Sequence, residues 1–150
     1  MKTILGLAAL KVAKSEMEAG AREIGGNNRG EFVEKYLSVC GLSPPQPWCA
    51  AFVSWCIHAA SKNALLRPTA SARGLLHAAR RIGLTTNKPS PGNLVFWSRG
   101  NPLGPYGHVG FVEKVVKGVL QTIEGNRTSA VGRFWHSIND PQILGFVRIE

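Results

Sequence analysis

Residues able to carry out nucleophilic chemistry stand in three separate segments of the sequence. The first is Cys49, which follows Pro47-Trp48 and opens an apolar helical stretch. Free amide groups and the macrodipole at a helix N-terminus stabilise negative charge, so a thiol there ionises more readily than an ordinary cysteine. Cys49 is therefore the candidate nucleophile. Cys40 and Cys56 come late in their helices, where the dipole opposes a thiolate, and are expected to be structural thiols.

A nucleophilic cysteine needs a base, and His108 is the histidine best placed for that role. Of the other three, His58 and His77 fall within helical patterns and His136 lies in an irregular stretch. His108 begins a strand directly after the Gly/Pro-rich loop 100–107, which would leave its ring at the rim of a cleft. A histidine at the end of a strand is more often simply solvated, so the assignment depends on its partners.

The imidazole of a Cys–His pair also needs a third group to orient it. Glu124 and Asn126 share one face of the next strand by the two-residue period. Counting back from a hairpin turn near 117–118 places Glu124 roughly opposite Val112, with Asn126 or the following residues nearer His108. A bulge or a longer strand would bring Glu124 closer, so both remain candidates.

These residues must be positioned by a helical first half and a strand-rich second half. Apolar spacing predicts helices over 3–24, 32–40 and 49–60, and a fourth that Ser71 caps and Gly83 closes. Alternation and turn residues predict strands over 93–97, 108–116, 119–123 and 143–149. The expected fold is α+β, with N-terminal helices packed on a C-terminal antiparallel sheet in a single domain, 1–150.

Four segments, in order, resemble CHAP domains, the cysteine, histidine-dependent amidohydrolases/peptidases of the NlpC/P60-like and papain-like group. They are PWCAAFVSWC (47–56), PGNLVFW (91–97), GHVGFV (107–112) and TIEGN (122–126). The closing LGFVR (144–148) is similar to the last strand of the family, so the resemblance extends over about residues 17–150. It implies a papain-like/NlpC-P60-like fold.

The resemblance also implies a mechanism. Cys49 would attack an amide carbonyl, His108 would take the thiol proton and pass it to the leaving amine, Glu124 would orient the imidazole, and Asn126 would assist. The backbone amide of Cys49 would help to bind the oxyanion. Gln46, three residues earlier, would place a side-chain amide beside it.

CHAP-like enzymes mostly cut peptidoglycan, either between muramic acid and L-alanine or within the stem peptide or cross-bridge. The chain carries 18 basic and 9 acidic residues, a net charge of +9, which suits an anionic cell wall or outer-membrane surface. Arg127 and Arg133 are the candidates for binding stem-peptide carboxylates. Trp48 and Trp97 either line the cleft or belong to the core.

A metal or other cofactor is not expected. Some phage CHAP domains carry an Asp-rich calcium loop near the N-terminus, but the single aspartate here, Asp140, is far from that region. The comparable segment, 25–30, contains an arginine instead of carboxylate ligands. No pair of Cys or His residues has the spacing of a zinc site.

A basic single domain without a clear signal peptide resembles a phage endolysin, made in the cytoplasm and released to the wall by a holin. An antibacterial amidase effector of the same chemistry, injected into the periplasm of a rival, fits equally well. A nucleic-acid-binding module is disfavoured because the helix 49–60 has no Lys or Arg. A non-catalytic wall binder would leave Cys49, His108 and Glu124 unexplained. A monomer is expected.

Overall fold

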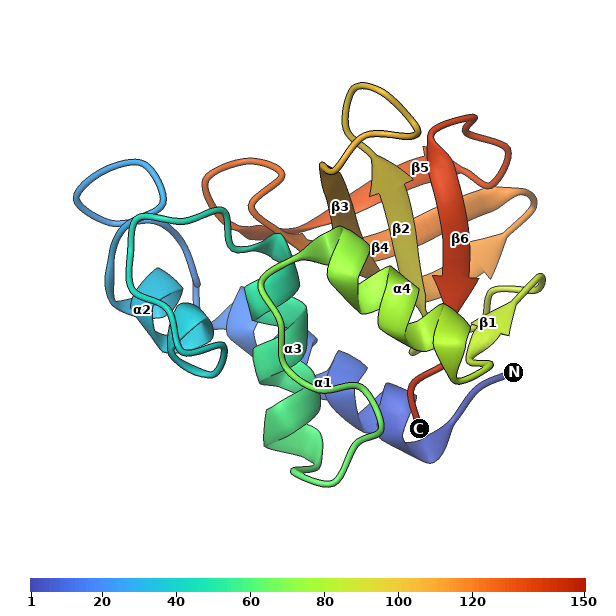
Figure 1. The fold of residues 1–150 in the computed structure, drawn as a ribbon, viewed down its shortest axis with the longest axis horizontal. Helices are drawn as coiled ribbons and strands as arrows, with labels where there is room; N and C mark the ends of the chain where they lie inside the picture. The colour runs from blue at the N-terminus through green and yellow to red at the C-terminus, as the bar shows by residue number, and fades with distance from the viewer.

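The computed structural model describes residues 1–150 and contains four helices (Figure 1). They are α1 (Ile4–Glu18), α2 (Glu31–Ser38), α3 (Cys49–Ala60) and α4 (Ala72–Arg81). The prediction for α3 is confirmed at both ends. The Ser71 side chain caps α4 as predicted, accepting a hydrogen bond from the N–H of Gly74 at 2.9 Å.

The predicted extent of the first helix, 3–24, is wrong at its C-terminal end. The chain leaves α1 after Glu18, and Gly20 adopts φ +79°, a conformation that favours glycine. The following residues pair with the segment after β4: Arg22 bridges to Ala130, and the N–H of Glu23 donates to the carbonyl of Ser129 at 2.8 Å. These long-range backbone hydrogen bonds replace those that a longer helix would have made.

Six strands form one antiparallel sheet in the order β1-β6-β2-β3-β4-β5. Their bounds are β1 (Thr85–Thr86), β2 (Leu94–Ser98), β3 (Gly107–Val116), β4 (Val119–Gly125), β5 (Val131–Ser137) and β6 (Ile143–Val147). The α+β class with an antiparallel sheet is confirmed. Two strands were not predicted: β1 is only two residues long, and β5 lies in the stretch that looked irregular.

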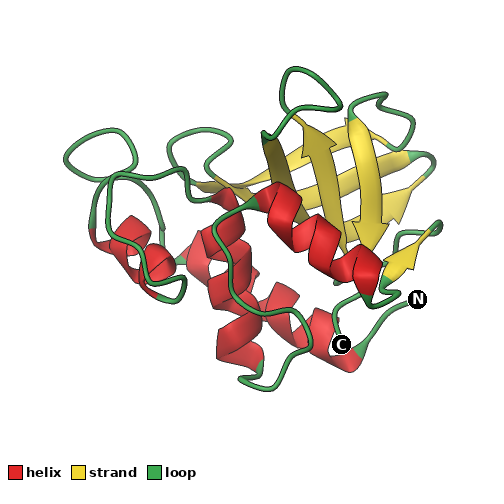
Figure 2. Cartoon of the chain, in the orientation of Figure 1, coloured by secondary structure: helices red, strands yellow, loops and turns green.

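The helices cover one face of the sheet, as Figure 2 shows, and α1, α3 and α4 all contact β3. A core cluster of 30 buried residues joins all four helices to β2, β3, β4 and β6. A smaller cluster, comprising Val95, Trp97, Val112 and Leu120, lies on the other face. Because successive strand residues point to opposite faces, β2 contributes to both clusters and is buried along its whole length.

The start of α3 and the start of β3 lie at the same end of the molecule, the upper end in Figure 1. An edge-to-face contact between Phe52 and Phe111, with ring centroids 6.4 Å apart, holds helix and strand together. Phe52 is one helical turn beyond Cys49, and Phe111 is three residues beyond His108. The core contact therefore fixes the start of α3, with Cys49, near the start of β3, with His108.

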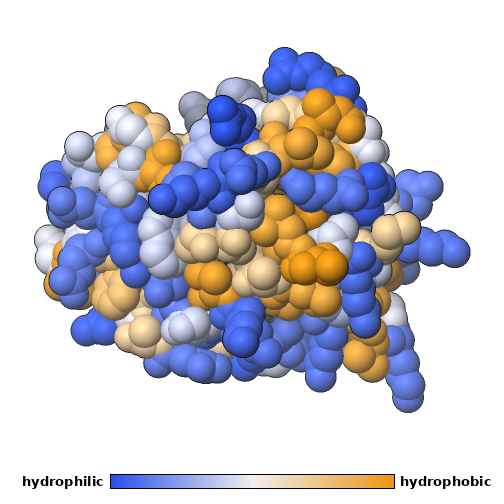
Figure 3. Space-filling view, turned by 90° about the horizontal axis from the view of Figure 1, so that it is seen from below, coloured by the Kyte–Doolittle hydropathy of each residue, from blue (hydrophilic) through white to orange (hydrophobic).

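Hydrophilic side chains surround bands of apolar ones on the face shown in Figure 3. Exposed apolar side chains include Ile4, Leu7 and Leu65. None of the helices has the length and hydropathy needed to cross a membrane.

Candidate active site

Cys49 is the first residue of α3 and is 7% exposed. Trp48 occupies the N-cap position without a side-chain capping bond, and the first turn carries no acidic residue. The thiol hydrogen-bonds to the His108 side chain and to the backbone N–H of Val109. The positive end of the helix dipole therefore acts on a sulfur that already has a base beside it.

His108 is 1% exposed and makes its firmest contact with Glu124. Its Nε2 donates to Oε1 of Glu124 at 2.7 Å. Because this bond occupies Nε2, Nδ1 is the nitrogen left for proton exchange with Cys49. In space, the three side chains form a connected series in which the thiol contacts the imidazole and the imidazole contacts the carboxylate. Nucleophilic catalysis by a cysteine requires this arrangement.

Glu124 is fully buried, and four side chains contact its carboxylate. Besides His108, the hydroxyl of Thr122 and Nε2 of His136 (2.7 Å) donate to Oε2, and Nε of Arg127 donates to Oε1. A buried carboxylate is costly unless it is hydrogen-bonded and charge-compensated, and here both conditions are met.

The expected pairing of Glu124 opposite Val112 is wrong. The structure pairs Val112 with Thr122, because a register shift at Glu113 inserts an extra residue into β3. Glu124 consequently lies further along the hairpin, beside Gly110 and closer to His108. Its Cγ occupies the space that a side chain at Gly110 would fill, 2.5 Å from the position of a Cβ.

Burial alone would raise the pKa of the Cys49 thiol and lower the pKa of the His108 imidazole. For Cys49, the interactions with His108, the N–H of Val109 and the charge of Arg99 outweigh burial; for His108, the interactions with Cys49 and Glu124 do. The pKa of Cys49 therefore lies below its ordinary value of 9.0, and that of His108 lies above 6.5. Burial would also raise the pKa of Glu124, but its bonds to His108 and His136 hold that pKa well below the usual range.

The other two cysteines have no such partners, and no disulfide is present. Burial raises the pKa of the half-buried Cys40 thiol and raises that of the fully buried Cys56 further. Only the thiol at the start of α3 is shifted toward the reactive form.

Three residues that sequence reasoning did not assign to the site contact its members. Thr122 and His136 bind Glu124, and Nη2 of Arg99 lies 3.0 Å from Nδ1 of His108. His136 was not assigned to the site because β5 was not predicted from the sequence. The two-residue spacing of Phe134 and His136, which places both on one face of a strand, was the signal that could have indicated it. Arg99 follows β2 at a distance of nine residues from His108, and no periodicity marks it.

Asn126, Gln46 and Trp48 lie around the start of α3. Asn126 directly follows β4, with φ +61°, and is half-buried, and Gln46 is exposed in the loop before α3. Trp48 is fully buried, stacked on Tyr36 with ring centroids 5.8 Å apart, and its indole N–H donates to Glu23 at 2.9 Å. Trp48 therefore belongs to the core and presents no surface to a substrate.

Two arginines that lie close together in the sequence occupy different places. Arg127 is at the site, bonded to Glu124, with its guanidinium 4.9 Å from the ring centroid of Trp97. The structure does not bring Arg133 there. Arg133 makes a two-point ion pair with Glu113, at 2.6 and 2.8 Å, and the alternation of strand residues directs it away from the face of Glu124.

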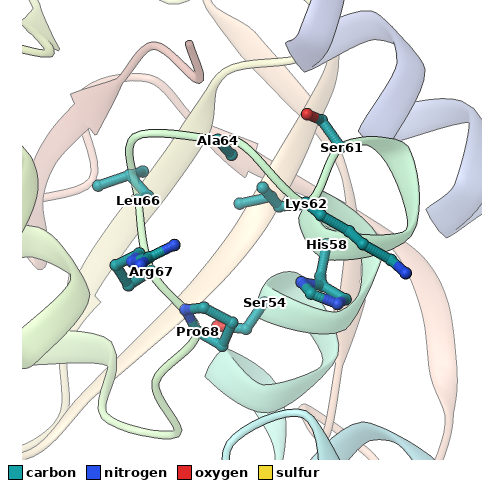
Figure 4. Close-up of a pocket in the computed structure, with 9 residues that line it drawn as sticks. Ser54, His58, Ser61, Lys62, Ala64, Leu66, Arg67 and Pro68 are labelled. Atoms are coloured by element: carbon teal, nitrogen blue, oxygen red, sulfur yellow. The ribbon is translucent and has the colours of Figure 1, made fainter.

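A polar hollow of about 400 Å³ opens beside His108. Its lining comprises Trp97, Ser98, Arg99, Gly100, His108, Arg127, Asp140 and Gln142. A second, tighter hollow of about 70 Å³ lies between the later part of α3 and the loop that follows it (Figure 4). It contains no member of the site, and its Ser54 hydroxyl is engaged by the backbone of Thr69. Of these two hollows, the one beside His108 is therefore the one lined by a member of the site.

No group of three or more His, Cys, Asp or Glu side chains is arranged to hold a metal ion.

This fold and site place the protein among α+β proteins that set a cysteine at a helix N-terminus against a histidine of an antiparallel sheet. A family model of the CHAP domain matches residues 42–126, more than half of the chain, including Cys49, His108 and Glu124. The protein belongs to the CHAP domain family.

Two solved structures share the fold: the crystal structure of Ly7917, with a TM-score of 0.63, and the crystal structure of Ly7917 with the hydrolyzing product of MDP, with a TM-score of 0.62. In both, the identity is 18% and the alignment covers 97% of this chain. This chain spans 62% of the length of Ly7917. No curated protein sequence matches the chain.

Proposed function

We propose that this protein is a hydrolase that cleaves an amide bond of peptidoglycan with Cys49 as the nucleophile. The observation that carries the proposal is the contact of the Cys49 thiol with His108, whose Nε2 lies 2.7 Å from the buried carboxylate of Glu124. Membership in the CHAP domain family supports the same chemistry. The substrate class is supported by a fold relative, Ly7917, which was crystallised with the hydrolyzing product of MDP, a peptidoglycan fragment.

In the proposed reaction the Cys49 thiolate attacks the amide carbonyl carbon, and the carbonyl π electrons move to oxygen. Collapse of this tetrahedral intermediate breaks the C–N bond, and the proton held on His108 goes to the leaving amine. A water molecule then attacks the thioester carbonyl while His108 takes its proton. Release of the carboxylic acid returns the proton and restores Cys49.

Glu124 acts through His108 in this scheme. Its carboxylate holds the imidazole with Nδ1 toward the thiol and stabilises the imidazolium that forms during catalysis. The backbone N–H of Cys49, at the uncapped start of α3, is the first donor for the oxyanion. The exposed Gln46 side chain is the proposed second donor, and Asn126 completes the edge of the site.

The bond cut is either the one between muramic acid and L-alanine or one within the stem peptide or cross-bridge. We place the activity at the cell wall, as that of a monomeric endolysin-type enzyme, with an injected amidase effector as the alternative. The net charge of +9 supports an anionic wall because it increases the rate of encounter with carboxylate and phosphate surfaces.

The test is the digestion of purified peptidoglycan, with released fragments identified by mass spectrometry. Wild type is compared with Cys49→Ala, and Cys40→Ser serves as the control that removes a different thiol. Fragments from wild type and Cys40→Ser, but not from Cys49→Ala, are the expected result. Free stem peptides identify an amidase, and glycans with trimmed stems identify an endopeptidase.

Equal release by wild type and Cys49→Ala would remove Cys49 from the mechanism. Walls of several chemotypes should be tried, because cross-bridges differ among bacteria. Failure of the folded wild-type protein to release fragments from any of them would overturn the peptidoglycan assignment.

A further inference from the structure

The contact of Arg99 with His108 is chemically at odds with the reaction just described. Nη2 of Arg99 lies 3.0 Å from Nδ1 of His108, and a guanidinium nitrogen can only donate. Nδ1 must therefore accept, which leaves the imidazole neutral, with its one proton on Nε2 toward Glu124. Arg99 therefore competes with the Cys49 thiol for the lone pair that has to receive the thiol proton.

The Arg99 side chain has few contacts that would prevent it from moving away from His108. It is exposed, and its guanidinium makes a single hydrogen bond, the one to His108. The backbone around it is held: the N–H of Arg99 donates to the carbonyl of Tyr106 at 3.3 Å, and Arg73 of α4 donates to the same carbonyl at 2.9 Å. Rotation of the Arg99 side chain is thus sufficient to free Nδ1, without movement of the loop.

The hollow beside His108 is suited to a ligand that would attract Arg99. It contains two guanidinium groups, those of Arg99 and Arg127, against one carboxylate, that of Asp140, which already accepts a bond from the N–H of Gln142 at 2.9 Å. Trp97 lines the same hollow, and its buried indole N–H has no hydrogen-bond partner. Arg127 is committed to Glu124 and Trp97, so Arg99 is the cation available to an anion.

We infer that Arg99 recognises a carboxylate of the substrate close to the scissile amide, and that pairing with this carboxylate withdraws Arg99 from His108. The inference rests on the proposed amide hydrolase and names a feature of its substrate. Arg99 and the Cys49 thiol both contact the His108 imidazole, so Arg99 lies no further than about two hydrogen-bond lengths, roughly 6 Å, from the sulfur if both contact Nδ1. An extended peptide rises about 3.3–3.6 Å per residue, so the carboxylate belongs within two residues of the bond that is cut.

In this arrangement, binding of the substrate frees His108 to act as the catalytic base. Without an anion, Arg99 competes with Cys49 for Nδ1 and hinders proton transfer from the thiol. With a carboxylate bound, a two-point guanidinium–carboxylate pair replaces the single bond to His108. Nδ1 is then free to take the thiol proton, and the positive charge of Arg99 stays near the thiolate, whose pKa it helps to lower.

Two alkylating reagents that differ only in charge test the anion site without any assumption about peptidoglycan. Iodoacetate and iodoacetamide each transfer a two-carbon group to a thiolate with loss of iodide, but only iodoacetate carries a carboxylate. The rate of modification of Cys49, measured by peptide mass spectrometry, is divided by that of free cysteine under the same conditions. Variants are Arg99→Met, Arg99→Lys and, as the control for loss of one positive charge, Arg67→Met, from the separate hollow of Figure 4.

The normalised iodoacetate/iodoacetamide ratio of wild type and Arg67→Met is expected to exceed that of free cysteine by about tenfold or more. Arg99→Met should bring the ratio to within about threefold of free cysteine, Arg99→Lys should retain part of the preference, and salt should weaken it. A ratio that is unchanged in Arg99→Met overturns the inference. If neither reagent modifies Cys49 in the folded protein, the anion site and the proposed nucleophile are overturned together.

A pair of synthetic muropeptides completes the test, one with a carboxylate on the residue flanking the scissile amide and the other with a carboxamide there. We expect Arg99→Met to lose roughly 10–100-fold in kcat/KM on the carboxylate substrate, and to cleave the carboxamide at least as fast as wild type, in which Arg99 stays on Nδ1. Equal losses on both substrates would show a merely structural role. If wild type cleaves neither substrate, the proposed function fails, and the alkylation ratio still decides whether Arg99 binds a carboxylate.

Discussion

The side chain of Glu124 reaches His108 by crossing the backbone of Gly110. A Cβ at Gly110 would lie 2.5 Å from Cγ of Glu124 and 3.2 Å from the carbonyl oxygen of Ile123. The absence of a side chain at Gly110 thus opens the path between the carboxylate and the imidazole. Gly110, the second glycine of the GHVGF segment, is therefore required by the position of Glu124 on the neighbouring strand.

Gly110→Ala should therefore disable the site more than it unfolds the protein. The added methyl group displaces Glu124, and we expect peptidoglycan hydrolysis to fall by about 10²-fold or more, because the imidazole loses its orientation. Overpacking should lower the free energy of unfolding by about 1–3 kcal/mol. Rates and thermal unfolding are measured together.

Gly145→Ala is the matched control for this substitution. It introduces the same methyl group in β6, where a Cβ meets no atom within 4 Å. It should leave both activity and stability near wild type. Full activity of Gly110→Ala would show that the position of Glu124 is unimportant.

Glu124→Gln tests the charge rather than the shape of the orienting group. The amide is nearly isosteric and still accepts from Nε2 of His108, but it cannot stabilise the imidazolium. We expect kcat to fall by about 10²–10⁴-fold, with a much smaller effect on KM. Circular dichroism checks the fold. A fall in activity of less than threefold would contradict the role assigned to the carboxylate.

The shifted pKa values predict a pH dependence of thiol reactivity. Because the pKa of Cys49 lies below 9.0 and that of Cys40 lies above it, iodoacetamide should modify Cys49 first as the pH rises from acid values. His108→Ala should move the Cys49 profile to higher pH, since it removes the hydrogen bond and charge that favour the thiolate. Coincident profiles for the two cysteines would argue against the pair.

The same groups predict how stability changes with pH. The depressed pKa of Glu124 stabilises the fold above the ordinary carboxyl value of 4.5, and this contribution is lost as the pH falls through the folded-state pKa. The raised pKa of His108 contributes stability below 6.5, which is lost as the pH rises through its folded-state value. The destabilisation caused by Glu124→Gln should be greatest between these limits. Urea unfolding at several pH values measures it, and a pH-independent difference would contradict the linkage.

His136 is a positioning residue, because it contacts Glu124 and not the thiol. His136→Phe removes the hydrogen bond to Oε2 and leaves three contacts on the carboxylate. We expect kcat to fall by about 3–30-fold with KM unchanged, whereas His136→Gln, which keeps a donor, should recover part of the loss. His77→Gln, at an exposed site on α4, is the control. An equal rise in KM would instead indicate direct contact with substrate.

The sequence by itself was enough to find the elements whose signals are local. The apolar stripe of 49–60 and the Ser71 cap define α3 and α4, because helical spacing and capping act within a few residues. For the same reason Cys49 could be recognised at a helix start and His108 at a strand start. The order of helices and strands was sufficient for the α+β class.

The tertiary structure decided what depends on contacts between distant segments. The bulge at Glu113 sets the register that brings Glu124 to His108, and pairing with β4 turns an irregular-looking stretch into β5, which carries His136 to the site. Strand alternation turns Arg133 away, although Arg127 stays at the site only six residues earlier. Arg99 contacts His108 only because β2 and β3 are hydrogen-bonded neighbours. Register and strand pairing are determined by the packing of the whole sheet, and no local pattern in the chain encodes them.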